Sequence, residues 1–231
     1  MSNAQPERHI TSKHFLMDYF SIERNEIIPL LPSSSGSILD VGCGRGTTLN
    51  LLHSQYPSAD LLGVEINHEV STTAKWPVLV GSIDENRIRM RLEDSGPYDL
   101  ILAMDILEHL TDPWETLRYL SSILAKGGQI ILSLPNISNA KVLLPLIFND
   151  SFSYVEAGIL DKTHLRFFTK KTACDLVLSS GLEIMQIIPT GPTCRHKVRS
   201  AKGWIAYMMN RMTFRSFERF IAHQWIVVAT S

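Results

Sequence analysis

Residues 37–49, SILDVGCGRGTTL, join a short apolar run to a cluster of glycines and then to a helix-like segment. The apolar run predicts a buried β-strand. Gly42, Gly44 and Gly46 allow the backbone to turn sharply, because glycine has no Cβ. The helix-like segment runs to Tyr56, where Pro57 stops it. A strand, a glycine turn and a helix in this order predict the first unit of an α/β protein.

The rest of the chain repeats this alternation. Residues 98–104, YDLILAM, form an almost continuous apolar run, which is typical of a parallel strand buried on both faces. Strands are expected at 37–41, 60–65, 78–80, 98–104, 129–134, 182–188 and 224–230. Helices are expected within 10–31 and at 47–56, 67–76, 113–126 and 169–180. The predicted fold class is therefore α/β with a mostly parallel sheet.

The helix that follows residue 112 carries the clearest end signals. Asp112 is a preferred N-cap residue, Pro113 suits the first helical position, and Glu115 stands three residues after the cap. Gly127 and Gly128 are expected to end this helix before the next strand begins.

Composition limits the possible functions. With 231 residues and a net charge of −1, the chain suits one domain and shows no overall attraction to nucleic acid. Cys43, Cys174 and Cys194 are odd in number and far apart, which argues against a disulfide framework or a zinc site and favours a reducing, cytoplasmic setting. No apolar run reaches the roughly 18 residues that a membrane span needs.

Two acidic residues stand where the first two strands end. Ligands of open α/β sheets bind at the carboxyl ends of the strands, so Asp40 and Glu65 are placed to meet one. Glu65 follows the glycine turn at about the spacing, roughly 20 residues, that is typical of a carboxylate binding ribose hydroxyls. The alternative is an ordinary turn with a surface glutamate.

The glycine spacing separates two classes of ligand. A nicotinamide site has GxGxxG and binds a pyrophosphate at the helix N-terminus, whereas this chain has glycines at 42, 44 and 46. Asp40 would repel a pyrophosphate but would suit a ligand that carries ammonium and sulfonium charges.

The combined motifs resemble those of the class I S-adenosylmethionine-dependent methyltransferases. They are ILDVGCGRGTTLNLL at 38–52, GVE at 63–65, and YDLILAMDILEHLTDPWETLRYLSSILAKGGQIILSLPN at 98–136. The sequence ILDKTHLRFFT at 159–169, followed by GLEI, narrows the resemblance to a bacterial branch often met beside glycosyltransferases. The resemblance implies a Rossmann-like, seven-stranded, mostly parallel sheet with helices on both faces and an antiparallel last strand at 224–230.

The resemblance also implies S-adenosyl-L-methionine as the methyl donor, with S-adenosyl-L-homocysteine as product. Asp40, Gly42 and Gly44 would line the methionine part, Glu65 would bind the ribose hydroxyls, and Ile66 would flank the adenine. The loop after the third strand would contact the adenine through Ser82, Ile83 and Asp84. Met104 and Asp105, at the end of the fourth strand, would face the sulfonium.

Asp105, Glu108 and His109 are spaced so that one turn of helix would put them on the same face. Such a group could hold a metal, as some relatives do. Alternatively, His109 packs under the cofactor or caps the following loop. We expect no bound metal and retain His109 as a candidate catalytic residue.

His164 is the leading candidate for a catalytic base, because a hydroxyl acceptor must lose a proton and histidine titrates near neutral pH. Asp161 could orient it, and Arg166 could bind an anionic group or form a structural ion pair. Alternatively, His164 bonds a backbone carbonyl and fixes its loop, while Phe167 and Phe168 enter the core.

The long segment 191–223 is basic and aromatic. From residue 195 to 223 it has seven Lys and Arg residues against Glu218 alone, so its charge is 7 − 1 = +6. It could lie in a membrane interface or meet an anionic lipid-linked substrate. Alternatively, it is a cap helix or the face of a homodimer.

The organisation expected is one methyltransferase domain over residues 1–231. It comprises N-terminal helices at 10–31, a cofactor-binding half at 36–135, and acceptor-side cover at 136–168 and 191–223. The function expected is methylation, through oxygen, of a small-molecule, sugar or lipid-linked glycan acceptor, without nucleic acid as a partner. The alternatives are a catalytically silent partner protein that binds the cofactor, and an NAD-dependent oxidoreductase.

Overall fold

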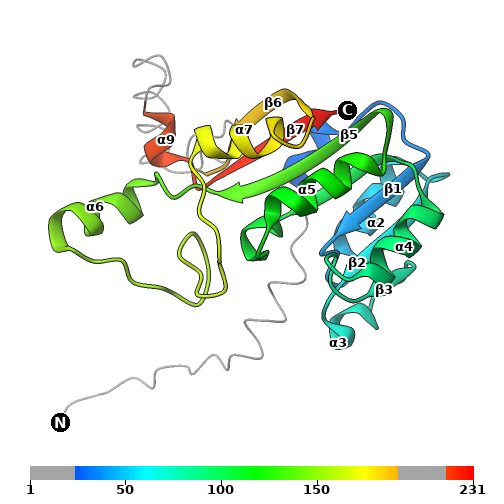
Figure 1. Ribbon diagram of the computed structural model, residues 1–231, viewed down its shortest axis with the longest axis horizontal. Helices are drawn as coiled ribbons and strands as arrows, with labels where there is room; N and C mark the ends of the chain where they lie inside the picture. The colour runs from blue at the N-terminus through cyan, green and yellow to red at the C-terminus, as the bar shows by residue number, and fades with distance from the viewer. Residues whose placement is uncertain (1–23, 192–216) are drawn as a thin grey trace, which may run out of the picture.

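The computed structural model describes residues 24–191 and 217–231 as a seven-stranded sheet (Figure 1). The strand order is β3-β2-β1-β4-β5-β7-β6. The strands are β1 (Ser37–Val41), β2 (Asp60–Glu65), β3 (Val78–Val80), β4 (Tyr98–Met104), β5 (Leu124–Pro135), β6 (Glu183–Pro189) and β7 (Gln224–Thr230). Only β7 runs against its neighbours, β5 and β6. The expected fold class is confirmed, including the antiparallel last strand.

Successive residues of the central strands point to opposite faces and build two cores. Leu39 and Val41 of β1 join one core with α4 (Asn86–Ser95), α5 (Pro113–Ser122) and α7 (Lys170–Leu178). Ile38 joins the other with the 3-10 helix η1 (Asn25–Leu30) and α2 (Thr47–Gln55). Because β1 and β4 are covered on both faces, their carboxyl ends form a rigid support for the site.

Gly127 and Gly128 lie inside β5 and do not end α5, so this expectation is wrong. The helix stops at Ser122, and Tyr98 N–H donates to the Ile123 carbonyl. A Cβ on Gly128 would lie 2.9–3.1 Å from three backbone oxygens, so glycine is required where β5 passes close to β4. The N-terminal signals of α5 are confirmed in part: Asp112 accepts from the Glu115 amide, but the Glu115 carboxylate binds Arg89.

Four other helices differ from expectation. The expected helix at 67–76 shortens to α3 (His68–Ser71), whereas α4 and α6 (Ala140–Asn149) were not predicted. Within the described part of 10–31 there is only η1, which contains Pro29; proline cannot donate the hydrogen bond that a continuing α-helix needs. Residues 10–23 and most of 191–223 lie outside the described residues.

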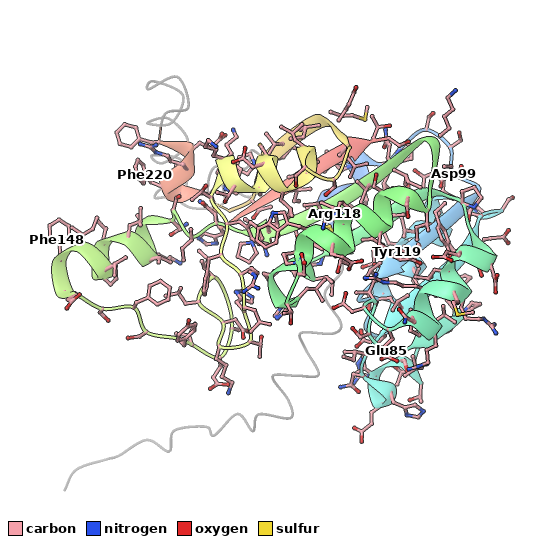
Figure 2. The ribbon with its side chains drawn as sticks, viewed as in Figure 1. Glu85, Asp99, Arg118, Tyr119, Phe148 and Phe220 are labelled. Carbon is pink, nitrogen blue, oxygen red and sulfur yellow. The ribbon has the colours of Figure 1, made fainter. Side chains whose placement is uncertain are left out.

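The helix α6 extends beyond the carboxyl end of β5, away from the sheet (Figure 1). Its outer side chains are apolar and exposed, and Phe148 lies at its far end (Figure 2). In the described part of the chain, no helix has both the length and the apolar character needed to cross a membrane.

Asn136, at the end of β5, joins this extension to the sheet. Its buried amide donates to the carbonyls of Arg219 and Ala222, at 2.7 and 2.9 Å, and its Oδ1 accepts from Ser138 N–H. Asn139 donates to Ala222 as well, at 2.8 Å. These bonds hold α9 (Glu218–Ile221) and the start of β7 against the first residues of α6.

Asn136→Ala is expected to lower the free energy of unfolding by about 2–3 kcal/mol, because it leaves buried carbonyls without donors. Urea unfolding of the variant and of the control Asn149→Ala, at an exposed position, measures this cost. An equal and small effect of both substitutions would contradict the assignment.

Candidate functional site

The glycine turn after β1 is held by the end of β2. Gly42 and Cys43 both donate to the Val64 carbonyl, at 2.8 and 3.1 Å. The buried carboxylate of Glu65 accepts from Gly44 N–H at 2.9 Å and from Asn67 N–H at 2.8 Å. Glu65 therefore fixes the two loops that should meet the cofactor, and each of its oxygens keeps a lone pair for a further donor.

Gly42 is required by its surroundings as well as by its backbone. Its φ is +75°, and a Cβ there would lie 2.0 Å from Cδ1 of Ile106, which follows β4. The glycine thus lets the loops after β1 and β4 approach each other closely.

Asp40 is buried at the carboxyl end of β1, and its Oδ2 has no hydrogen-bond partner among the described residues. Burial raises the pKa of Asp40 from 3.8 to about 7, against the opposing attraction of Arg24, and the nearby Glu65 adds to the rise. A cationic ligand would compensate the ionised carboxylate here, which agrees with the predicted role of Asp40.

Arg24 is a site residue that the sequence did not reveal. Its guanidinium pairs with Asp105 at the end of β4. Asp105 also accepts from Ser133 Oγ at 2.5 Å and from Gln224 Nε2 at 2.7 Å. Arg24 is the N-cap residue of η1, and no sequence pattern around it marks it as functional.

Asp105, Glu108 and His109 do not lie on one face of a helix, contrary to expectation. Asp105 has a φ of +56°, and only Leu107–His109 form a helical turn, the 3-10 helix η2. Asp105 therefore turns toward Arg24, whereas Glu108 and His109 meet His164. Met104, one residue earlier, is buried at the strand end as expected.

The residues expected around the adenine lie after β2 and β3. Ile66 is 71% exposed and offers an apolar surface, while Ile83 is buried. Ser82 N–H donates to the Glu85 carboxylate, and Asp84 accepts from Thr116 Oγ1 at 2.8 Å. One oxygen of Asp84 therefore already binds Thr116 of α5. The contact of Asp84 with adenine stays a prediction.

Glu108, His109 and His164 form a second cluster beyond the end of β4. One oxygen of Glu108 and one ring nitrogen of each histidine lie within 4.8 Å of one another. The two imidazoles meet edge to face, with centroids 4.8 Å apart. The fold thus brings the two predicted catalytic histidines together and places a carboxyl group beside them. The same three groups could hold a divalent metal.

Hydrogen bonds to carbonyl groups orient both imidazoles. His164 Nδ1 lies 3.1 Å from the Ile159 carbonyl, and His109 Nδ1 lies 3.3 Å from the Thr163 carbonyl. Because a carbonyl only accepts, the bonded nitrogen must carry the proton, which leaves Nε2 of each neutral ring as the basic atom. Burial lowers the pKa of His164, while the Ile159 carbonyl opposes this shift.

The loop around His164 is folded by its own polar groups. Asp161 Oδ1 accepts from Thr163 N–H and Oγ1, at 2.8 and 2.6 Å, so Asp161 shapes the turn and does not bond the imidazole. Arg166 donates to the Thr111 carbonyl and forms no carboxylate pair among the described residues. Phe168 enters the core as expected, whereas Phe167 is only partly buried.

The strand-end residues fit S-adenosylmethionine. The unpartnered oxygen of Asp40 suits the cationic part, the Glu65 carboxylate suits vicinal hydroxyls, and Arg24 suits a carboxylate.

Comparison with known proteins identifies the family. A model of the methyltransferase domain matches residues 15–187, more than half of the chain. A ubiquinone biosynthesis O-methyltransferase from Aeromonas salmonicida is 27% identical over 152 residues, which cover 63% of this chain and 62% of that protein. A protein of the same name from a Caulobacter species is 29% identical over 102 residues, 43% of this chain and 40% of that one. The chain thus spans about three fifths or less of these relatives' length.

Solved structures share the fold. An S-adenosylmethionine-dependent methyltransferase from Archaeoglobus fulgidus has a TM-score of 0.66 at 17% identity, covering 96% of this chain and 100% of that one. The plantazolicin methyltransferase, solved with S-adenosylhomocysteine, has a TM-score of 0.53 at 18% identity, covering 84% and 77%. The chain belongs to the methyltransferase domain family and has the fold of the class I S-adenosylmethionine-dependent methyltransferases.

Proposed function

We propose that the protein transfers a methyl group from S-adenosylmethionine to a hydroxyl oxygen of a small-molecule, sugar or lipid-linked glycan acceptor. The observation that carries the proposal is the orientation of His164 beside the end of β4. Its Nδ1 proton is directed to the Ile159 carbonyl, so Nε2 is available to take a proton from an acceptor.

The named relatives support oxygen as the methylated atom. Two proteins that match part of this chain carry the name ubiquinone biosynthesis O-methyltransferase. A phenolic or alcoholic acceptor must lose its proton during methylation, and a buried imidazole with a free Nε2 meets that requirement.

The donor would be held by the strand-end residues. Asp40 and Arg24 would bind the charged groups of its methionine part, and Glu65 would bind its ribose hydroxyls. Ile66 and the loop Ser82–Asp84 would contact the adenine. The bound donor supplies an electrophilic methyl group on a sulfonium, which leaves alignment and proton removal to the protein.

His164 would take the proton from the acceptor hydroxyl on Nε2 as the new carbon–oxygen bond forms. Its Nδ1–H bond to Ile159 keeps the ring from turning, and His109 packs against its edge. The cover formed by 136–168 would exclude water from this proton transfer, which strengthens the electrostatic interactions within it.

The test is release of S-adenosylhomocysteine during incubation with S-adenosylmethionine and a panel of simple phenols, catechols and sugars. We expect release with at least one hydroxyl compound and a product methylated on oxygen. A product methylated on nitrogen or carbon would contradict the proposal. If the protein binds the cofactor but releases S-adenosylhomocysteine with none of the acceptors, the alternative of a catalytically silent partner protein would be favoured.

His164→Ala is expected to reduce turnover by about 10²–10⁴-fold, the usual contribution of a general base, and to leave cofactor affinity unchanged. The matched control is His68→Ala, at an exposed position of α3. Normal turnover by a folded His164→Ala protein would remove this residue from the chemistry.

Glu65→Ala is expected to weaken S-adenosylhomocysteine binding by about 1.5–3 kcal/mol, because charge-assisted hydrogen bonds to the ribose and to the Gly44 amide are lost. Calorimetry measures the affinity, with Glu69→Ala as a control at an exposed site nearby. An unchanged affinity of Glu65→Ala would refute the ribose role.

Asp40 should make the cofactor-free protein less stable as the pH rises. Between pH 3.8 and about 7, the folded protein keeps a proton on Asp40 that the unfolded chain has released. The free energy of unfolding of Asp40→Asn, measured relative to the wild type, should therefore be about 2–4 kcal/mol higher at pH 8 than at pH 5. Urea unfolding at both pH values, with the exposed Asp60→Asn as control, measures the difference. Parallel pH profiles for Asp40→Asn and the wild type would contradict the assignment.

A further inference from the structure

Exposed apolar side chains gather on the extension of the fold that contains α6. Of the fifteen large hydrophobic side chains that are exposed within residues 24–191 and 217–231, seven lie between residues 144 and 155. They form what we call the α6 surface, namely Leu144, Leu146, Ile147, Phe148, Phe152, Tyr154 and Val155. Single exposed hydrophobic side chains are ordinary, but a group of this size indicates a site of interaction.

The helix α6 has the composition of a buried helix but is not buried. In its sequence, AKVLLPLIFN, only Val142 is buried, whereas Ile147 is 68% and Phe148 77% exposed. Phe148 lies at the far end of the helix, away from the sheet (Figure 2). Ten residues are about half of the roughly 20 that a membrane-spanning helix needs. The length therefore suits a helix that lies in an interface.

The loop after α6 holds its exposed aromatic side chains in place. The rings of Phe152 and Tyr154 meet edge to face, with centroids 5.7 Å apart, and Phe152 meets Phe167 in the same way at 5.7 Å. The backbone is fixed as well, since Val155 N–H donates to the Leu160 carbonyl at 2.9 Å. Binding through these side chains therefore need not order them first.

Charge separates the possible partners of the α6 surface. Between residues 144 and 155 the only charged residue is Asp150. Residues 192–216, outside the described part of the chain, contain six Lys and Arg residues and no Asp or Glu. Their charge is therefore +6, and that of the remaining chain is −1 − 6 = −7. A partner that meets both the α6 surface and this basic segment would have to be apolar and anionic.

The basic segment 192–216 is attached to the fold beside the first residues of α6. The carbonyl of Thr190, just before the segment, accepts from His223 N–H at 2.9 Å. Asn139, the N-cap residue of α6, donates to the carbonyl of Ala222 at 2.8 Å. The apolar helix and the excess positive charge are thus attached at one end of the sheet.

We propose that the α6 surface binds the surface of an anionic lipid bilayer, with α6 at the boundary between headgroups and acyl chains. Apolar and aromatic side chains bind at this boundary, and Lys and Arg residues nearby are attracted to anionic headgroups. A second copy of the chain fits less well, because a twofold contact through α6 would bring two segments of charge +6 together.

The inference stands apart from methyl transfer. The α6 surface belongs to the cover 136–168, which also contains His164. A bilayer bound there would bring a lipid-linked acceptor close to the site, and this consequence alone rests on the proposed function.

Sedimentation of the full chain with vesicles tests the proposal. We expect binding to vesicles of mixed phosphatidylcholine and phosphatidylglycerol, weaker binding to phosphatidylcholine alone, and a decrease of binding as salt is added. The double substitution Ile147→Ser and Phe148→Ser should lower the partition coefficient by about 10-fold or more, because two exposed apolar side chains no longer enter the lipid.

The matched control is the double substitution Leu178→Ser and Met185→Ser, at side chains of α7 and β6 that are 56% and 57% exposed. It should leave vesicle binding unchanged. Absence of binding to the anionic vesicles would overturn the proposal. Equal binding of the wild type and of the α6 double variant would also overturn it, by assigning the contact to the basic segment alone.

Fluorescence of Phe148→Trp shows whether α6 itself enters the lipid. On the background of the four native tryptophans, lipids brominated near the headgroup should quench the added tryptophan more strongly than that of Met185→Trp. Equal quenching of both would overturn the proposal.

Analytical ultracentrifugation without lipid tests the second copy as the partner. We expect the wild type and the α6 double variant to sediment alike. A dimer of the wild type that dissociates in the α6 double variant would assign the α6 surface to a second copy and overturn the proposal. Because none of these measurements involves methyl transfer, their failure would leave the proposed function intact.

Discussion

The carboxylate of Glu65 connects the parts on which the site depends. Its two oxygens hold Gly44 in the turn after β1 and Asn67 in the turn after β2. These bonds hold the turn after β1 and the turn after β2 in one position relative to the sheet. Because β1 is covered on both faces, this arrangement is rigid, and ligand binding need not order these loops.

A concentration of buried acidic groups follows from this geometry. Asp40, Glu65 and Glu108 are buried at or just beyond the carboxyl ends of strands, and the partly buried Asp105 lies with them. Arg24 pairs with Asp105. Such a site attracts a cationic ligand and destabilises the protein without one. We infer that part of the cofactor's binding energy relieves this repulsion, a cost that the protein retains for function.

The strands could be predicted from the sequence because buried parallel strands are continuous apolar runs, as in 98–104. The helix α4 was missed because its sequence, NRIRMRLEDS, buries only Ile88 and Leu92, which is too few for a clear helical pattern. The helix α6 was missed for the opposite reason: it is apolar but buries only Val142, so it resembles no ordinary surface helix. The predicted helix end at Gly127 and Gly128 was wrong because a glycine pair suits a strand bulge as well as a helix end.

The positions of Asp40 and Glu65, where we propose that the cofactor binds, could be predicted because both residues lie at the carboxyl ends of apolar strands. The cluster of Glu108 with the histidines could not, since Glu108 and His164 belong to distant segments that meet only when the loop 159–168 folds onto η2. Arg24 was missed because its position depends on the packing of η1 against the second core. Local patterns therefore identified the histidines as candidates but not the carboxyl group beside them.

A crystal structure of the protein with S-adenosylhomocysteine would show directly whether Asp40 and Glu65 bind the cofactor. We expect the ribose hydroxyls within about 3.2 Å of the Glu65 carboxylate and the sulfur facing His164 Nε2. A ligand bound away from Asp40 and Glu65, or a His164 ring separated from the sulfur by the sheet, would contradict this expectation.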